Sequence, residues 1–305
     1  MITNGDLTEH IAYFKASSFL PTHILRFVWT YYKLLKTVGS FDIIHAHVWS
    51  KRTFFSYLLS LFLRKPLTIS EHWSGYKDKL QPFERFFCKV VFKKASSILV
   101  VSNFLQSLME EKGIKGNYQI IGNVVEKQEH LSIETSPFKF LVVADLRDEI
   151  KNVSGIIRAF KKLEGNVTLN ITGGGTDKQR LAQEANNRIC FKGRLENSDV
   201  LYQIKNHHCL VINSRIETFS VVALESLAAG KPIIFTRCGG PEEIIPENCG
   251  IPISINNEQE LYDAMQSMIT NHTAFSPKEL QSAVEKFYPE KIGAEINKVY
   301  HNVLQ

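Results

Sequence analysis

The stretch that decides the fold is SRIETFSVVALESLAAGKP, residues 214–232. The residues before it, HHCLVINS (207–214), are apolar and β-branched between polar ends, and they predict a buried strand. The run VVALESLAA (221–229) predicts a helix, which Gly230 and Pro232 are placed to end. The stretch therefore predicts a strand, a tight turn and a helix.

Two glutamates, Glu217 and Glu225, lie at the start of this helix with seven residues between them. Thr218 or Ser220 can cap the helix, because a side-chain oxygen there accepts from a free backbone N–H. Such a helix start suits a phosphate, since it presents free N–H groups and partial positive charge. Glu225 lies only about one turn inside, with its side chain leaning back toward the start. A bound diphosphate would leave one acid facing a sugar and the other a ribose. An isolated pair of glutamates more often lies on a solvated helix surface, so the surrounding residues must decide between that interpretation and a ligand site.

Predicted strands and helices alternate along most of the chain, and a polar, unpatterned stretch at 126–139 separates two such series. We therefore predict an α/β fold with two facing doubly wound, Rossmann-like domains. The domains are expected at 1–124 and 125–288, and a terminal helix at 289–305 is expected to pack back on the first. The predicted strands are 41–47, 66–72, 96–102, 118–123, 138–146, 167–173, 188–193, 209–214, 232–237 and 250–255.

The composition fits a protein with two medium α/β domains, since 44% of its 305 residues are hydrophobic. The net charge of +5 favours anionic partners such as nucleotides or acidic lipids, and no DNA- or RNA-binding motif is found. Five cysteines without paired spacing predict a reduced, cytoplasmic protein rather than a disulfide framework or zinc site. The first ten residues lack a signal-peptide core, and the longest apolar run, 53–63, is too short to span a bilayer.

Polar residues gather at the predicted carboxyl ends of the strands, where sheets of this kind bind ligands. Arg147 and Lys151 follow one strand and could neutralise a diphosphate, although a solvated helix start is equally expected. Three glycines in TGGGTDK (172–178) suit close approach to a ligand or an ordinary turn, and they lack dinucleotide-binding spacing. His72, in SEHWSGY (70–76), could hydrogen-bond a sugar or a transferring group, or be a capped core histidine.

Two further patterns concern metals and membranes. His45 and His47 share a strand face without a third ligand, so a metal site is not expected there. The chain has no Asp-x-Asp, so we expect no magnesium–diphosphate clamp, no cofactor and a metal-independent function. Aromatic and basic residues mix at 51–65 and 83–94, which predicts core helices with basic outer faces or a face that lies on an anionic membrane.

Two facing doubly wound domains, together with the segment ETFSVVALE (217–225) and its two glutamates, resemble the retaining GT-B glycosyltransferases of family 4. The resemblance extends from about residue 40 to the end of the chain. Other segments fall in the family's order: FDIIHAH (41–47), ISEHWSGY (69–76), IIGNVVE (120–126), TGGGTDK (172–178), FKGRL (191–195) and SLAAGKPIIFTRCGGPEEII (226–245).

This resemblance implies transfer of a sugar, with retention of configuration, from a UDP- or GDP-linked donor to a glycan or lipid-linked acceptor. The implied role is in the synthesis of cell-surface polysaccharide. The protein would be cytoplasmic and would lie peripherally on the inner face of the membrane, and nucleic acid is not an expected partner. His72 and Glu217 would act at the donor sugar, Glu225 at the ribose and Lys151 at the diphosphate. The amides of Thr218, Phe219, Ser220 and Val221 would hold the distal phosphate. The other implied donor-binding residues are Arg147, Gly173, Gly174 and Arg194.

The sequence departs from the family pattern in two places. Asp145 stands where the family often has its diphosphate arginine, and Arg147 is the expected substitute. Nothing before Phe41 resembles the family's opening strand and glycine-rich loop, so we expect a chain that begins partway into the first domain. Two alternatives to a transferase remain open. One is a sugar-nucleotide epimerase of the same fold, and the other is an inactive remnant that only binds nucleotide.

Overall fold

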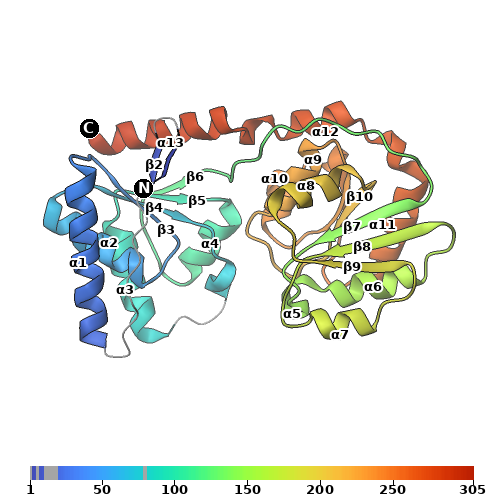
Figure 1. Cartoon of the computed structure of the whole chain (residues 1–305), viewed down its shortest axis with the longest axis horizontal. Helices are drawn as coiled ribbons and strands as arrows, with labels where there is room; N and C mark the ends of the chain where they lie inside the picture. Colours follow the sequence, from blue (N-terminus) through green and yellow to red (C-terminus); the bar gives the residue numbers. More distant parts are fainter. Residues whose placement is uncertain (1, 5–6, 10–19, 78–80) are drawn as a thin grey trace.

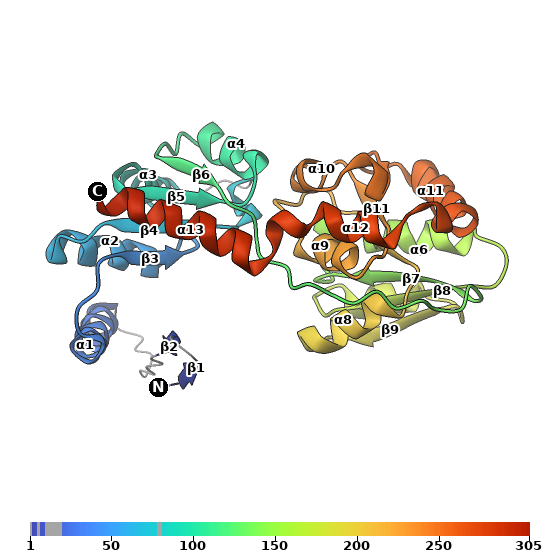
Figure 2. The same ribbon diagram turned by 90° about the horizontal axis from the view of Figure 1, so that it is seen from above.

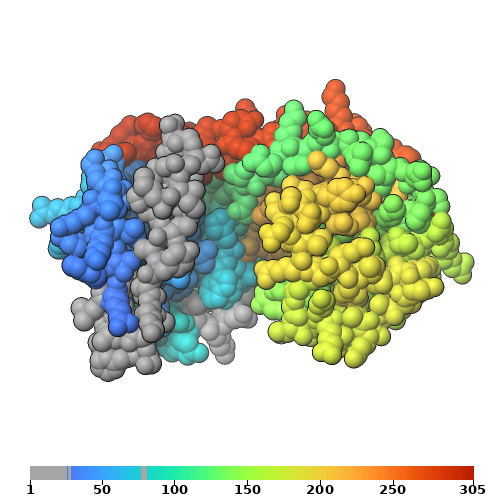
Figure 3. Space-filling view, in the orientation of Figure 1, coloured from blue at the N-terminus to red at the C-terminus, as the bar shows by residue number. Residues whose placement is uncertain are grey.

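The computed structural model describes residues 2–4, 7–9, 20–77 and 81–305. It has two lobes side by side, each built on a parallel sheet, with the last two helices running along one edge of both (Figures 1 and 2). The space-filling view shows the connection between the sheets on the surface of the second lobe (Figure 3). Within the described part of the chain, no helix is both long and apolar enough to cross a membrane.

The first lobe contains a four-stranded parallel sheet in the order β3-β4-β5-β6. Strands β4 and β5 are buried along their whole length, as is usual in a parallel sheet, although β4 (LTISE) includes the polar residues Thr68, Ser70 and Glu71. The elements of this lobe are β3 (Ile44–His47), α2 (Lys51–Leu63), β4 (Leu67–Glu71), η1 (Ser74–Lys77), α3 (Pro82–Lys94), β5 (Ser97–Val100), α4 (Asn103–Glu111) and β6 (Tyr118–Ile120).

Before this sheet lie an antiparallel hairpin of β1 (Ile2–Asn4) and β2 (Leu7–Glu9) and a long helix, α1 (Leu20–Val38). The sequence analysis assigned no element to this region. The signal for α1 is present all the same, because LPTHILRFVWTYYKLL repeats its apolar residues at helical spacing.

The second lobe contains a six-stranded parallel sheet in the order β12-β11-β10-β7-β8-β9. From β7 the chain moves to β8 on one side, and from β10 it moves to β11 on the other. The crevice beyond the ends of β7 and β10 is therefore the switch point where such sheets bind ligands. The strands are β7 (Phe138–Val143), β8 (Val167–Thr172), β9 (Ile189–Gly193), β10 (Cys209–Ile212), β11 (Ile233–Thr236) and β12 (Gly250–Ile253).

Helices cover both faces of this sheet, so its inner residues form a second core around Phe140, Phe160 and Ile171. The α/β class with two parallel sheets is thus confirmed, and the second sheet is doubly wound. The helices are α5 (Asp148–Lys151), α6 (Val153–Lys161), α7 (Lys178–Gln183), α8 (Asn197–Lys205), α9 (Val221–Ala228), α10 (Gly240–Ile244) and α11 (Glu258–Asn271).

The two lobes are packed against each other. One apolar cluster runs from the first sheet through Phe219 to Phe287, whose rings meet edge to face at 5.4 Å. Gly122 lies between these rings, and a Cβ there would come within 2.8 Å of both. The chain ends with α12 (Pro277–Ala283) and α13 (Pro289–Leu304), and α13 reaches the first sheet, where Tyr300 Oη and His45 Nδ1 are hydrogen-bonded.

Candidate functional site

A cavity of about 140 Å³ lies at the carboxyl ends of β7 and β10, beside the start of α9. It is smaller than the roughly 300–1,000 Å³ of typical ligand pockets, so it suits part of a nucleotide sugar rather than the whole molecule. Its lining residues are Val142, Val143, Ala144, Lys151, Val211, Ile212, Asn213, Ser214, Glu217, Ser220, Val221 and Val222. Four of the residues named from the sequence therefore come together here, from two separate strand–helix turns.

Lys151 and Glu217 form an ion pair inside this cavity, through Nζ and Oε1. Both side chains are mostly buried, and Ser214 Oγ donates to the same carboxylate oxygen at 2.8 Å. The main chain of Glu217 is fixed as well, because Gly240 N donates to its carbonyl at 2.7 Å. A cation and an anion are thus held ready beside a helix start.

The start of α9 lacks the cap that the sequence predicts. Ser220 is the N-cap residue, with a left-handed backbone (φ 75°), but its side chain makes no capping hydrogen bond. The Thr218 hydroxyl instead donates to the carbonyl of His72 in the other lobe, at 3.0 Å. The prediction of a side-chain cap was therefore wrong. Since neither hydroxyl caps the helix, its first amides keep their capacity to bind an anion.

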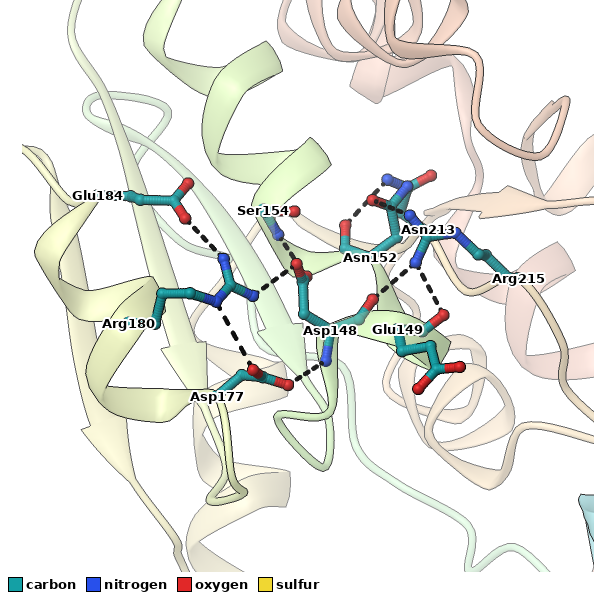
Figure 4. A network of polar contacts seen from close by, with 9 residues as sticks. All are labelled: Asp148, Glu149, Asn152, Ser154, Asp177, Arg180, Glu184, Asn213 and Arg215. Atoms are coloured by element: carbon teal, nitrogen blue, oxygen red, sulfur yellow. Dashed lines mark hydrogen bonds and ion pairs between the residues drawn. The ribbon is translucent and has the colours of Figure 1, made fainter.

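Lys151 ends α5, a four-residue helix that a polar network holds in place (Figure 4). Arg215 Nη1 donates to the carbonyls of Asp148 and Glu149 at 2.7 and 2.8 Å. The Asp148 carboxylate accepts from Ser154 N and from Arg180 Nη2, both at 2.8 Å. Burial opposes ionisation of Asp148, but these hydrogen bonds outweigh it and lower its pKa.

No pattern in the sequence points to Asp148, Arg180 or Arg215 as partners in this network. In the sequence they look like ordinary surface charges, and only the fold brings them together. Arg215 could have been singled out, because it lies beside Glu217 in the decisive stretch.

Arg147 lies outside the set of residues that line the cavity. Its Nε atom is paired with Asp145 Oδ2 at 2.7 Å, and both side chains are about half exposed. The aspartate that replaces the family's usual arginine therefore holds the expected substitute in an ion pair at the surface.

Gly173, Gly174 and Arg194 support the wall of the cavity without lining it. A Cβ on Gly173 would lie 1.8 Å from the carbonyl oxygen of Ala144, and its φ is +139°. Leu146 N donates to the carbonyl of Gly174 at 2.8 Å. A Cβ on Gly174 would lie 3.8 Å from Cβ of Arg194. Gly173 thus allows the turn after β8 to lie directly against the turn after β7, whereas Gly174 has room for a Cβ.

Glu225 lies on α9, about one turn beyond the cavity-lining residues. Its side chain is half-buried, and no described residue donates a hydrogen bond to its carboxylate or pairs with it. Burial raises the pKa of this carboxyl to about 7. A buried acid without a donor is suited to accept hydrogen bonds from a ligand.

His72 begins a loop that the buried carboxylate of Glu71 organises. This carboxylate accepts from His72 N and Trp73 N at 2.9 Å, and from Trp49 N and Tyr76 Oη at 2.8 Å. Burial raises the pKa of Glu71, although the four hydrogen bonds oppose that shift. Asn123 hydrogen-bonds the His72 side chain, whose pKa is lowered by burial and by nearby His47.

Comparison with known proteins bears on the family and the fold of the chain. The model of the family described as glycosyl transferases group 1 matches residues 123–287, and that of glycosyltransferase family 4 matches residues 4–129. The match therefore begins well before residue 40, where the resemblance in the sequence seemed to start.

An uncharacterised glycosyltransferase of Methanocaldococcus jannaschii is 26% identical over 89% of this chain and 79% of its own length. N-acetyl-alpha-D-glucosaminyl L-malate synthase of Bacillus anthracis is 26% identical over 52% of this chain, but this match spans only 44% of that relative. Among solved structures, HepE of Anabaena in complex with UDP superposes with a TM-score of 0.79 and 19% identity, covering 89% of this chain and 81% of HepE. HepE has also been solved with UDP-glucose.

The family model covers more than half of the chain, and the solved neighbours share its two-lobed architecture. The chain therefore belongs to the glycosyl transferases group 1 family and is a glycosyltransferase with the GT-B fold.

Proposed function

We propose that this protein transfers a sugar from a nucleotide-diphosphate sugar to a glycan or lipid-linked acceptor, with retention of configuration. The observation that carries the proposal is the cavity at the switch point, where Lys151 and Glu217 meet the uncapped start of α9. The complexes of the structural neighbour HepE with UDP and UDP-glucose support a uridine nucleotide as the first donor to test.

In this proposal the diphosphate lies between Lys151 and the first amides of α9. Positive charge from the ammonium group and from the helix start offsets the phosphate charge. Glu217 turns toward sugar hydroxyls once Lys151 has a phosphate partner. Glu225 accepts from the ribose hydroxyls, and His72 lies on the facing lobe, near the reacting bond.

Titration of UDP into the protein tests the donor site by calorimetry. Glu225→Ala should weaken binding by about 1–3 kcal/mol, because the ribose loses a charged hydrogen-bond acceptor. Glu295→Ala, at an exposed position of α13, is the control and should bind like wild type. Unchanged UDP affinity in Glu225→Ala would contradict the proposed role of α9 in donor binding. Analysis of the sugar products separates transfer from epimerisation of the donor.

We also propose that donor binding needs no metal ion. This proposal rests on Lys151 and the α9 amides, which can supply the positive charge that a metal provides elsewhere. UDP affinity and donor turnover should be the same in EDTA as in magnesium or manganese. A loss of turnover in EDTA that either metal restores would contradict the proposal.

A third proposal concerns the membrane, and it rests on the first lobe. Phe83 and Phe86 at the start of α3 are 74% and 61% exposed, and both contact the half-buried ring of Phe87. Basic residues lie on the same helix, among them Arg85 between the two exposed rings and Lys89 after them. Exposed aromatic rings beside cations suit an anionic lipid surface, which fits a lipid-linked acceptor in cell-surface polysaccharide synthesis.

A further inference from the structure

Both main-chain polar groups of His72 are hydrogen-bonded, each by a different lobe. Within the first lobe, His72 N donates to Glu71 Oε1 at 2.9 Å. From the second lobe, Thr218 Oγ1 donates to the carbonyl of His72 at 3.0 Å. The position of this histidine therefore depends on where the second lobe lies.

Thr218 is itself rigidly placed. It is 8% exposed, and its carbonyl accepts from Ser102 Oγ at 2.6 Å. A Cβ on Gly240 would lie 2.3 Å from that carbonyl, so the start of α10 lies directly against the main chain of Thr218. The turn that carries Thr218 also carries Glu217 and leads into α9. A movement of the donor-binding turn is therefore transmitted to the first lobe through the Thr218 hydroxyl.

We propose that Thr218 is a positioning residue that ties His72 to the donor-binding turn, so that His72 reaches its working position only when the lobes are closed. This inference rests on the proposed function, in which His72 lies near the reacting bond. A shift of about 1 Å in a group near the reacting atoms can slow a reaction by about a hundredfold, so one such bond matters.

The residue type is important because valine has the shape of threonine without the hydroxyl. Thr218→Val removes the donor to His72 and leaves the backbone amide that would face a phosphate. Thr218→Ser keeps the donor, and it is the rescue variant. Thr270→Val, at an exposed position of α11, controls for the loss of a hydroxyl elsewhere.

The first measurement is the release of UDP from UDP-glucose, compared with UDP affinity from calorimetry. Thr218→Val should lower kcat about tenfold, equivalent to about 1.4 kcal/mol, while the Kd for UDP changes less than about twofold. Thr218→Ser should recover most of the rate. Equal kcat in wild type and Thr218→Val would overturn the proposal. A loss of UDP affinity as large as the loss of rate would overturn it too, since Thr218 would then act in donor binding.

The second measurement needs no ligand, so it is independent of the donor. Amide hydrogen exchange at His72 and Trp73 should be faster in Thr218→Val than in wild type and Thr218→Ser. Equal exchange in all three proteins would overturn the positioning role. If the wild type neither binds UDP nor releases it from UDP-glucose, the uridine donor is wrong, and the exchange comparison still decides the role of Thr218.

Discussion

At the scale of single residues, the site keeps ionisable groups in surroundings that suit ligand binding but lower the stability of the ligand-free protein. Glu225 shows this most clearly, because its half-buried carboxyl has no donor among the described residues and has a pKa of about 7. An exposed glutamate ionises near pH 4.5, so the folded protein resists the charged form. The stabilising contribution of the neutral acid is complete below about pH 4.5 and is lost as the pH rises through 7.

We therefore predict that Glu225→Gln stabilises the ligand-free protein at pH 8. The free energy of unfolding should rise by about 1–2 kcal/mol relative to wild type, a value reduced for the partial exposure of the group. The difference should disappear near pH 4.5, where both side chains are neutral. Urea denaturation at the two pH values measures this. The same difference at both pH values would show that the effect comes from packing and not from ionisation.

At the scale of elements, the α5 helix shows how much of the site depends on contacts that are distant in sequence. Its four residues cannot form a stable helix alone. Arg215, from the turn after β10, supplies donors for its carbonyls. The alternation of strands and helices was enough to predict that the polar turns lie at the carboxyl ends of the strands. It could not predict Arg215 or Asp148 as partners, because a hydrogen bond between distant charges leaves no periodic pattern.

Replacing Arg215 tests this dependence. Arg215→Met should lower the free energy of unfolding by about 1–3 kcal/mol, because two carbonyls of α5 lose a charged donor. Amide exchange in 148–151 should become faster, and UDP affinity should fall since Lys151 is less well placed. Arg158→Met, which removes a half-exposed ion pair with Glu258, is the control and should change stability by less than about 1 kcal/mol. Slow exchange in 148–151 of Arg215→Met would contradict this account.

The α3 helix carries the prediction about membranes. Wild type should float with liposomes that contain acidic lipid at low salt, and should stay in the soluble fraction with neutral liposomes. Phe83→Ser with Phe86→Ser should abolish flotation. Tyr202→Ser, at an exposed position on α8 of the second lobe, is the control for the loss of an exposed ring and should still float. Equal recovery of wild type with acidic and neutral liposomes would refute the membrane face.

At the scale of the whole molecule, the second lobe fixes the start of a helix in the first. Glu243 on α10 accepts from Asn103 N at 2.8 Å and from Phe104 N at 2.6 Å. These two amides lie in the first turn of α4 and have no partner within that helix. A carboxylate from one lobe therefore caps a helix of the other. The sequence predicted two facing lobes, but it did not predict this contact, since a cap normally lies next to its helix in the chain.

Removing this carboxylate should loosen the closed arrangement. Fluorescence energy transfer between dyes at exposed Cys190 and at an engineered cysteine on α2 should fall in Glu243→Gln. UDP affinity should stay the same, because Glu243 lies outside the donor cavity. Glu247→Gln is the matched control. Unchanged transfer efficiency would mean that the remaining contacts between the lobes, among them those of Thr218 with His72 and Ser102, hold them together without Glu243.

The Lys151–Glu217 pair has one more consequence. The two side chains neutralise each other, so the pair presents little net charge to small anions in solution. A ligand that separates the pair must replace both partners, with phosphate oxygens for the ammonium group and hydroxyl donors for the carboxylate. Inorganic phosphate supplies only the first, and a free sugar supplies only the second. A molecule that carries both a phosphate and sugar hydroxyls is therefore favoured over phosphate alone or sugar alone, even without any contact to a nucleotide base.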